Sequence, residues 1–464
     1  MMTLTGQATR TDRMTGKRLV ILGLARQGKA LARFAAGCGV EVVVSDLRSA
    51  DALTDAIADL SDLNIELVLG SHPDSLLDGT DMLAISGSVP ANAAFVNKAR
   101  ARGIVVTNDS AEFLARSPAP VIGITGSAGK STTTSLVGEM GKASGVPTWV
   151  GGNLGFPLID MLDGMAADDI VVQELSSFQL EIWNRAPHIA AILNVTPNHL
   201  DRHKTMAVYT AAKANILRFQ TAGDIAILPN ESLEPLFPLV QGRLRTFSMT
   251  TEVADGAFVR DGEIVLRDLF SAETTVCSIS DIRLRGRHNI LNVLAACVLA
   301  DSRGISVEAM RRAIRAFTGI GHRLEQVATI NGVEYINDSI ATAPERAIAA
   351  LHAFDEPLIL LVGGRDKDLD WDPLVELVQT QCKAVLLFGD LAPMVAPMLA
   401  KTAILSEMCG TMTDAVNRAH AIANAGDVVL LSPGGTSYDA YKDFAERGVH
   451  FRKIVNKLKE NDEY

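Results

Sequence analysis

A phosphate-binding loop is the clearest chemical signal in the sequence. The apolar run Val121–Thr125 leads into the glycine-containing loop Gly126–Gly129, and Lys130–Thr132 then opens a segment with helical spacing. Glycines let the backbone N–H groups of such a loop face phosphate oxygens, and the helix N-terminus favours the same anion. The strict G-x-x-x-x-G-K-[ST] pattern fails only at its first position, Ile124. The residues predicted to bind ATP here are Gly126, Gly129, Lys130, Ser131 and Thr132.

Side chains around this loop have the chemistry of a magnesium site. Lys130 is predicted to reach the β- and γ-phosphates, and the hydroxyl of Ser131 or Thr132 to hold Mg²⁺. Glu174 ends a second apolar run, Ile170–Val172, where a further magnesium ligand is expected.

A third polar segment follows, and its chemistry has two interpretations. The spacing His199-x-Asp201-x-His203 fits a transition metal, whereas a neighbouring nucleotide favours an oxygen-rich Mg²⁺ site. The sequence alone leaves His199 open between them. Lys213 by itself has the pattern of a solvated helix lysine.

The first and last parts of the chain carry weaker ligand signals. Gly23–Gly28 follows a strand and Asp46 ends the next one, as in a dinucleotide fingerprint, but Ala25 replaces its second glycine. In the last part, Ser437 is predicted to cap a helix over 438–446, and Arg323 could reach a γ-phosphate.

The elements that position these residues alternate between short apolar runs and helical segments, which predicts parallel sheets joined by right-handed crossovers. We expect an α/β protein with three domains in series. They are a Rossmann-like nucleotide-binding domain over residues 1–117, a central P-loop ATPase-type domain over 118–318, and a C-terminal Rossmann-like domain over 319–464. Asp-Gly pairs at 255–256 and 261–262 predict hairpin turns within the central domain.

Composition excludes several classes of protein. The 464 residues are 48% hydrophobic and 21% charged, with a net charge of −11, which fits a large globular core and argues against non-specific binding to nucleic acid or anionic membrane. The sequence has no uncharged apolar run of membrane-spanning length. Five widely spaced cysteines fit a reduced cytoplasm. Residues 1–16 are expected to form a frayed tail.

Several motifs occur in one order along nearly the whole chain, from about residue 18 to 451. They are ITGSAGKSTTT, GGNLGFP, ELSSFQLE, NVTPNHLDRH, YTAAKANI, GRHNILNVLAA, GHRLE, YINDSIAT, GGRDK and LLSPGGTSYDAYKDFAERG. Together they resemble the Mur ligases of peptidoglycan precursor synthesis, above all those that add glutamate to UDP-N-acetylmuramoyl-L-alanine. The resemblance implies an ATP-dependent, amide-forming enzyme that works through an acyl phosphate, needs two Mg²⁺ ions, and acts as a cytoplasmic monomer on small molecules.

The resemblance also assigns residues to roles, by position. It implies catalytic roles for Lys130, Lys213, His199 and Arg323. It implies ATP contacts by His288, Asn289, Arg323 and Asp338 in addition to the phosphate loop. It implies magnesium ligation by Ser131, Glu174, His199 and Lys213, with Lys213 carrying CO₂ as a carbamate. It implies UDP-substrate contacts by Arg26, Gln27, Asp46, Arg48, Ser88 and Asn153. It implies glutamate contacts by Thr342, Lys367, Ser437 and Phe444.

One departure from the family pattern bears on the acceptor. The resemblance favours D-glutamate as the acceptor. The family usually has a lysine where this chain has Ile340, and this departure leaves L-glutamate as the alternative. More distant alternatives are another ligase of the superfamily, such as a folate polyglutamylating enzyme, an NAD(P)-linked dehydrogenase built on Gly23–Asp46, and an ATP-binding regulator.

Overall fold

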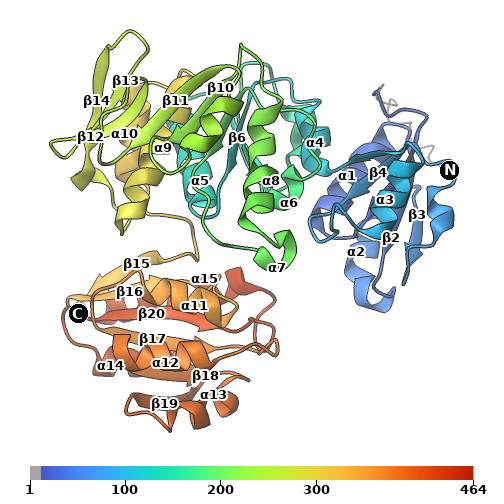
Figure 1. Cartoon of the computed structure of the whole chain (residues 1–464). Coiled ribbons are helices and arrows are strands. Elements are labelled where there is room, and N and C mark those ends of the chain that lie inside the picture. The colour runs from blue at the N-terminus through green and yellow to red at the C-terminus, as the bar shows by residue number, and fades with distance from the viewer. Residues whose placement is uncertain (1–11, 463–464) are drawn as a thin grey trace, which may run out of the picture. The chain divides into compact units, whose positions relative to one another are not determined.

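The computed structural model describes residues 12–462 of the chain, and it contains three β-sheets (Figure 1). The chain divides into two compact units. The first unit holds the residues up to 283 together with 287–317, and the second holds 284–286 together with 318–464. The predicted α/β class with three domains in series is confirmed, because each predicted domain contains one of the sheets. The limits at 117 and 318 stay predictions.

The first sheet has five parallel strands in the order β3-β2-β1-β4-β5. This order reverses direction between β1 and β4, and ligands of such sheets bind at the carboxyl ends of the strands beside that switch point. The strands are β1 (Arg18–Leu22), β2 (Glu41–Asp46), β3 (Glu66–Leu69), β4 (Met82–Ile85) and β5 (Val105–Thr107), and the helices are α1 (Arg26–Gly37), α2 (Thr54–Ala58), α3 (Ala94–Ala101) and α4 (Asp109–Leu114).

The second sheet has nine strands in the order β14-β13-β12-β11-β10-β9-β6-β8-β7. Its strands are β6 (Val121–Thr125), β7 (Thr148–Gly152), β8 (Ile170–Glu174), β9 (Ile189–Ile192), β10 (Ile225–Pro229), β11 (Arg243–Ser248), β12 (Gly256–Arg260), β13 (Glu263–Arg267) and β14 (Glu273–Ser278). Its helices are α5 (Lys130–Ala143), α6 (Ser177–Leu180), α7 (Leu200–His203), α8 (Met206–Arg218), α9 (Arg287–Ser302) and α10 (Val307–Ala316). β6, which precedes the phosphate loop, is wholly buried and lies between β8 and β9.

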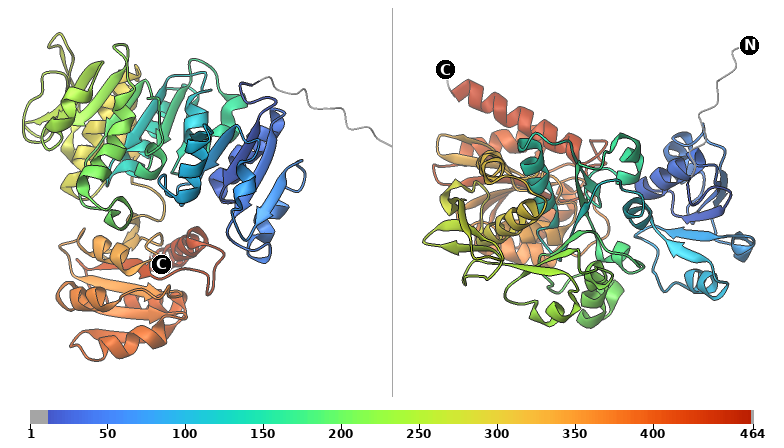
Figure 2. Two further views of the ribbon diagram at one scale, coloured as in Figure 1. Left: turned by 45° about the vertical axis from the view of Figure 1, so that its right-hand side comes forward. Right: turned by 90° about the horizontal axis from the view of Figure 1, so that it is seen from above.

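The third sheet has the order β15-β16-β20-β17-β18-β19 and forms the second unit. Its strands are β15 (Glu325–Ile330), β16 (Val333–Asn337), β17 (Leu358–Gly363), β18 (Cys382–Phe388), β19 (Leu405–Gly410) and β20 (Val428–Gly434). Its helices are α11 (Pro344–Leu351), α12 (Asp372–Gln381), α13 (Ala392–Leu399), α14 (Met412–Ile422) and the long α15 (Phe444–Asp462), which is prominent in Figure 2.

Both faces of the third sheet are buried, which explains the continuous apolar runs of its strands. In β17, Leu358 and Leu360 pack in the cluster that contains α11, α12 and α13. The alternate residues Ile359 and Leu361 pack in the cluster that contains α14 and α15. Successive side chains of a strand point to opposite faces, so a buried central strand needs apolar residues at every position.

Two local expectations are wrong. Only Asp261-Gly262 turns a hairpin, between β12 and β13; Gly256 instead begins β12, which runs parallel to β11. The Asp255 carboxylate just before β12 is bound by Arg243 and Arg245. Ser437 caps no helix, since α15 begins at Phe444.

The expected tail is partly folded. Residues 1–11 lie outside the described residues, but Met14 is fully buried and Asp12 forms an ion pair with Arg116. No helix among residues 12–462 is both long and apolar enough to cross a bilayer.

Candidate functional site

The phosphate loop is fixed in shape by two asparagines that come from distant segments. The Asn194 side chain accepts a hydrogen bond from Ala128 N (2.9 Å) and donates one to Ala128 O (3.1 Å). Gly129 has φ = 79°, and a Cβ at this position would lie 2.2 Å from Asn292 Oδ1. Any larger residue at Gly129 would therefore clash with α9 as well as strain the backbone.

Two lysines converge on one carbonyl of the loop. Lys130 Nζ and Lys213 Nζ each donate to Gly126 O at 2.9 Å, and Lys130 also donates to Ser127 O at 3.2 Å. Lys130 comes from the first turn of α5 and Lys213 from α8, more than eighty residues later. The result is two cationic groups beside backbone N–H groups at a helix N-terminus, an arrangement suited to a polyphosphate.

Lys213 lies in surroundings that disfavour its charge. Its side chain is 1% exposed, and its ammonium lies 4.6 Å from the centre of the Tyr209 ring. Burial, together with the charge of the nearby Lys130, lowers the pKa of Lys213 to about 7. A large fraction of the neutral amine is therefore present near neutral pH, and the neutral amine is the form that reacts with electrophiles.

Glu174 is buried and keeps one oxygen available. Its Oε1 accepts a hydrogen bond from Asn153 Nδ2 at 2.8 Å. Its Oε2 is buried with no hydrogen-bond partner among the described residues. A buried carboxylate oxygen without a donor suits a hard cation such as Mg²⁺, so Glu174 fits the ion that the sequence predicts there.

The hydroxyls of the phosphate loop and His199, which are also predicted to hold magnesium, lie at half-buried or exposed ends of helices. Ser131 and Thr132 are half-buried in the first turn of α5. His199 precedes α7 with φ = 53°, and its ring lies 5.0 Å from that of Phe178.

A transition-metal site gains no support from the geometry. His203 lies 2.9 Å from Ser177 through Nε2 and stacks on Phe178. Within the described part of the chain, no group of three or more His, Cys, Asp or Glu side chains lies close enough to hold a metal ion.

The predicted adenine contacts His288 and Asn289 lie in the first turn of α9. Asn289 Oδ1 accepts from Asn292 Nδ2 at 2.9 Å, and Asn292 in turn contacts Gly129. Asn289 therefore lies close to the phosphate loop, and Asn292 links the two. The sequence motifs alone assign no role to Asn292.

The predicted UDP contacts gather at the carboxyl ends of β1, β2 and β4, beside the switch point. Arg26 and Gln27 begin α1 after β1, Asp46 ends β2, and Ser88 follows β4. Asp46 accepts from Leu24 N (2.8 Å) and binds the Arg48 guanidinium, which holds the pKa of Asp46 well below its usual range.

Asn153 is the predicted UDP contact that comes from the central sheet. Its carbonyl accepts from Arg26 Nη2 at 3.2 Å, while its side chain binds Glu174. Arg202, which the sequence analysis gave no role, donates to Gly87 O (2.6 Å) and Val89 O (2.9 Å) in the loop that carries Ser88. In the sequence, the only sign of this role is that Arg202 is a cationic residue within the NVTPNHLDRH motif.

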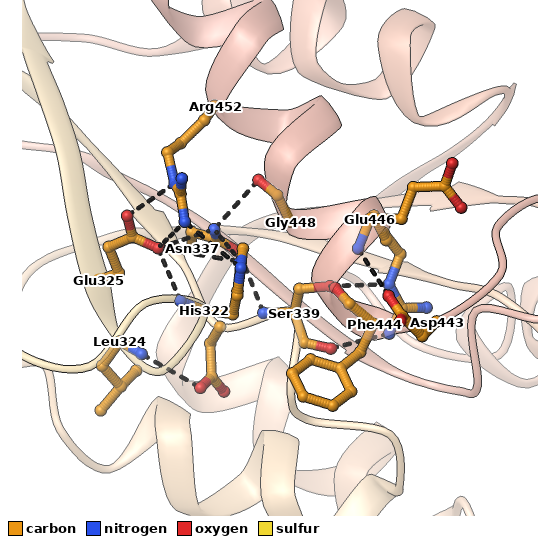
Figure 3. Close-up of polar contacts among 12 residues, drawn as sticks. His322, Leu324, Glu325, Asn337, Ser339, Asp443, Phe444, Glu446, Gly448 and Arg452 are labelled. Carbon is orange, nitrogen blue, oxygen red and sulfur yellow. Dashed lines mark hydrogen bonds and ion pairs between the residues drawn. The ribbon is translucent and has the colours of Figure 1, made fainter. Parts of the chain in front are cut away.

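In the second unit, Figure 3 shows His322, Leu324 and Glu325 in a tightly held loop. Arg323 belongs to the same loop. Its two neighbours, His322 and Leu324, both have positive φ, at 66° and 42°. Glu325 Oε2 accepts from His322 N (2.6 Å), and Arg452 of α15 forms an ion pair with Glu325. These contacts fix the backbone while the Arg323 side chain stays exposed, ready to meet an anion.

Asp338, which directly follows β16, supports the same loop. Its Oδ1 accepts from Leu324 N at 3.2 Å, and its Oδ2 from Ser432 Oγ at 2.9 Å. Burial raises the pKa of Asp338 to about 7.

The predicted glutamate contacts lie on loops that follow β16, β17 and β20 and at the start of α15. Thr342 is half-buried, Ser437 is buried, and Lys367 and Phe444 are exposed. The sequence analysis assigned no role to the residue that ties these loops together, Arg447.

Arg447 is fully buried in α15. It donates to Ser339 O (2.9 Å), Ser339 Oγ (3.0 Å) and Gly435 O (3.1 Å), and Ser339 Oγ donates to Phe444 O. Burial lowers the pKa of Arg447 to about 10. This one guanidinium therefore orders the loop of Ile340, the loop of Ser437 and the backbone of Phe444.

Comparison with known proteins agrees with this geometry. Family models match residues 17–108 (Mur ligase MurD-like, N-terminal domain), 124–300 (Mur ligase middle domain) and 322–435 (Mur ligase, glutamate ligase domain). The chain is 38% identical over 448 residues to the UDP-N-acetylmuramoylalanine–D-glutamate ligase of Symbiobacterium thermophilum, covering 95% of this chain and 98% of that protein. It is 37% identical to the enzyme of the same name from Pelotomaculum thermopropionicum, covering 96% and 98%.

Solved structures show the same fold at lower identity. UDP-N-acetylmuramate–alanine ligase of Thermotoga maritima aligns with a TM-score of 0.55 at 18% identity, covering 95% of this chain and all of that one. MurF of Acinetobacter baumannii also aligns with a TM-score of 0.55, at 17% identity, covering 95% and 93%. With three matched domains and relatives of this identity along nearly its whole length, the chain belongs to the Mur ligase family.

Proposed function

We propose that this protein is an ATP-dependent ligase that joins D-glutamate to UDP-N-acetylmuramoyl-L-alanine. The observation that carries the proposal is the phosphate loop with Lys130 and Lys213 on one carbonyl, in a chain 38% identical to a relative of that name. Membership of a ligase family favours this reaction over the dehydrogenase alternative.

The proposed reaction has two steps. A carboxylate oxygen of the muramoyl-alanine attacks the γ-phosphorus of ATP, the bond to the bridging β–γ oxygen breaks, and ADP leaves. The glutamate nitrogen then attacks the carbonyl carbon of the acyl phosphate, loses a proton, and expels inorganic phosphate as the amide forms.

The protein contributes mainly charge and position to both steps. Lys130 and the N-terminus of α5 offset the negative charge of the ATP phosphates. Arg323 is proposed to bind the γ-phosphate, because its loop holds the backbone and leaves the guanidinium exposed. His288, Asn289 and Asp338 complete the proposed nucleotide contacts.

Two Mg²⁺ ions are proposed to bind Ser131, Glu174, His199 and a carbamate on Lys213. The partnerless Oε2 of Glu174 supports this assignment. When bound, the ions would polarise the phosphoryl oxygens and offset their charge. The lowered pKa of Lys213 supports the carbamate, since the neutral amine takes up CO₂.

The two organic substrates are assigned to opposite parts of the chain. Arg26, Gln27, Asp46, Arg48, Ser88 and Asn153 are proposed to bind the UDP substrate, and Thr342, Lys367, Ser437 and Phe444 the glutamate. Since ATP is a substrate, we place the enzyme in the cytoplasm, and we propose that it acts as a monomer.

A cation lies close to Ile340, where the family usually has lysine. Arg346 donates to Ile340 O at 3.3 Å from the first turn of α11. This guanidinium could supply the charge that Ile340 lacks, so D-glutamate stays the proposed acceptor.

Phosphate release from ATP tests the proposal, measured with UDP-N-acetylmuramoyl-L-alanine and with D- or L-glutamate in parallel. Release that requires D-glutamate is expected. Release that requires L-glutamate would keep the mechanism and change the product, and release with neither would contradict the assigned substrates.

A further inference from the structure

A cavity lies at one end of the first sheet. The proposed UDP contacts lie at the other end. The cavity has a volume of about 440 Å³ and is lined by the segments that precede β1, β4 and β5, including Lys17, Asp81 and Ile104. Asn184 and Arg185, which follow α6 of the central sheet, close another side. This volume is in the range of pockets that hold small molecules.

The charges that line the cavity are mostly positive. Four basic residues face two acidic ones: Arg13, Lys17, Arg102 and Arg185 against Asp81 and Glu112. Arg13 forms an ion pair with Glu112, and Arg102 with Asp78 outside the cavity. For the side chains of Lys17 and Arg185, no hydrogen bond or ion pair is found within residues 12–462.

Arg185 is the more informative of these two cations. It is half-buried, and burial together with the charge of Arg13 lowers its pKa. A partly desolvated guanidinium without a partner is costly, and a bidentate anion is the partner that its planar fork fits best.

The rest of the lining suggests the size and polarity of the ligand. Ile104, Val105 and Ile182 supply apolar surface next to the cations, and Val105 is 53% exposed. β5 is also the edge strand of its sheet, so alternate backbone groups of Val105–Thr107 have no strand partner.

We propose that this cavity is a second ligand site, separate from the substrate sites, for a small anion that carries a phosphate or carboxylate group and an apolar part. Lys17 and Arg185 bind the anionic group, and the apolar side chains contact the remainder. Because the site joins the first sheet to the segment after α6, an occupant also strengthens the contact between the two.

Calorimetric titration tests the site with two probes, pyrophosphate and citrate, on enzyme already saturated with a non-hydrolysable ATP analogue. This analogue occupies the phosphate loop, so binding there does not contribute. The wild type is expected to bind at least one probe saturably, and the double variant Lys17→Gln/Arg185→Gln to bind it about tenfold more weakly. Binding of pyrophosphate would indicate a phosphate ligand, and binding of citrate would indicate a carboxylate ligand.

The matched control is Lys98→Gln, which removes an exposed lysine of the first domain outside the cavity. It should bind the probe as the wild type does. Unchanged affinity in the double variant, or no saturable binding in the wild type, would overturn the proposal. Thermal unfolding supplies a second measurement, since the probe should raise the Tm of the wild type and of Lys98→Gln more than that of the double variant.

Discussion

The phosphate loop and the proposed glutamate pocket both depend on cations, but they use them in opposite ways. Around the phosphate loop, Lys130 brings its charge to the carbonyl of Gly126, beside the proposed site of the ATP phosphates, and Lys213 donates to the same carbonyl. In the pocket, Arg447 is buried beneath the surface and binds the backbone of Ser339 and Gly435. One region presents charge to a ligand, whereas the other uses charge to shape loops. Loss of a cation should therefore affect chemistry in the first region and affinity together with stability in the second.

The largest effect is expected from Lys130→Ala. Removing a charge that is proposed to face the ATP phosphates should lower the rate of phosphate release about 10³-fold and leave thermal unfolding nearly unchanged. Lys142→Ala, an exposed lysine of the same helix, is the control and should retain the wild-type rate. A Lys130→Ala enzyme with near wild-type activity would contradict the proposed function.

Lys213→Ala tests the second lysine of that region and should lower the rate about 10²-fold. Since the proposed active form of Lys213 is a carbamate, bicarbonate together with a short carboxylic acid should restore part of the activity. Removing CO₂ from the wild-type assay should also slow it. The carbamate assignment would be dropped if neither effect is observed.

Arg447→Met is expected to act on the pocket rather than on the chemistry. Leaving the Ser339 and Gly435 carbonyls without a donor should lower the free energy of unfolding by about 1–3 kcal/mol and raise the KM for glutamate about tenfold. The affinity for ATP, measured by direct binding, should change less. Arg418→Met, an exposed arginine paired with Glu407, is the control. Equal losses of glutamate and ATP affinity would argue against a specific role in the pocket.

The smallest effect concerns the pH dependence of stability. The pKa of Asp338 rises from 3.8 to about 7, so the folded state holds a proton that the unfolded chain releases. This contribution to stability is fully present below about pH 4 and is lost as the pH rises through 7. Between about pH 5 and pH 8, the wild type should lose on the order of 2 kcal/mol more unfolding free energy than Asp338→Asn. The free energy of unfolding of both proteins is measured by urea unfolding at several pH values. If it changes with pH in the same way in both, the argument from the burial of Asp338 is contradicted.

The two regions also differ in how far the sequence predicts them. The phosphate loop is one contiguous motif, and its strand, turn and helix form where the sequence places them, as do most strands of the three sheets. Asn194 and Asn292, which brace the loop, come from other segments, so local spacing gave no reason to pair them with it.

The pocket depends even more on contacts that are remote in sequence. β15 and β19 were not predicted as strands because their side chains are mostly half-exposed and lack the apolar runs of the central strands. The prediction that Ser437 caps a helix is wrong because residues 438–443 form turns and bends, and α15 begins only after them. The role of Arg447 depends on the packing of α15 against the loops after β16 and β20, which the local sequence pattern does not predict.

The position of Arg447 also sets an order of events during synthesis. Its guanidinium binds Ser339, which precedes it by 108 residues, and α15 is the last helix among residues 12–462. Chains fold as they emerge from the ribosome, so the phosphate loop can form while the final helix is still being made. The proposed glutamate pocket cannot become ordered until that helix is released. A nascent or prematurely terminated chain could therefore bind nucleotide before it has an ordered place for the amino acid.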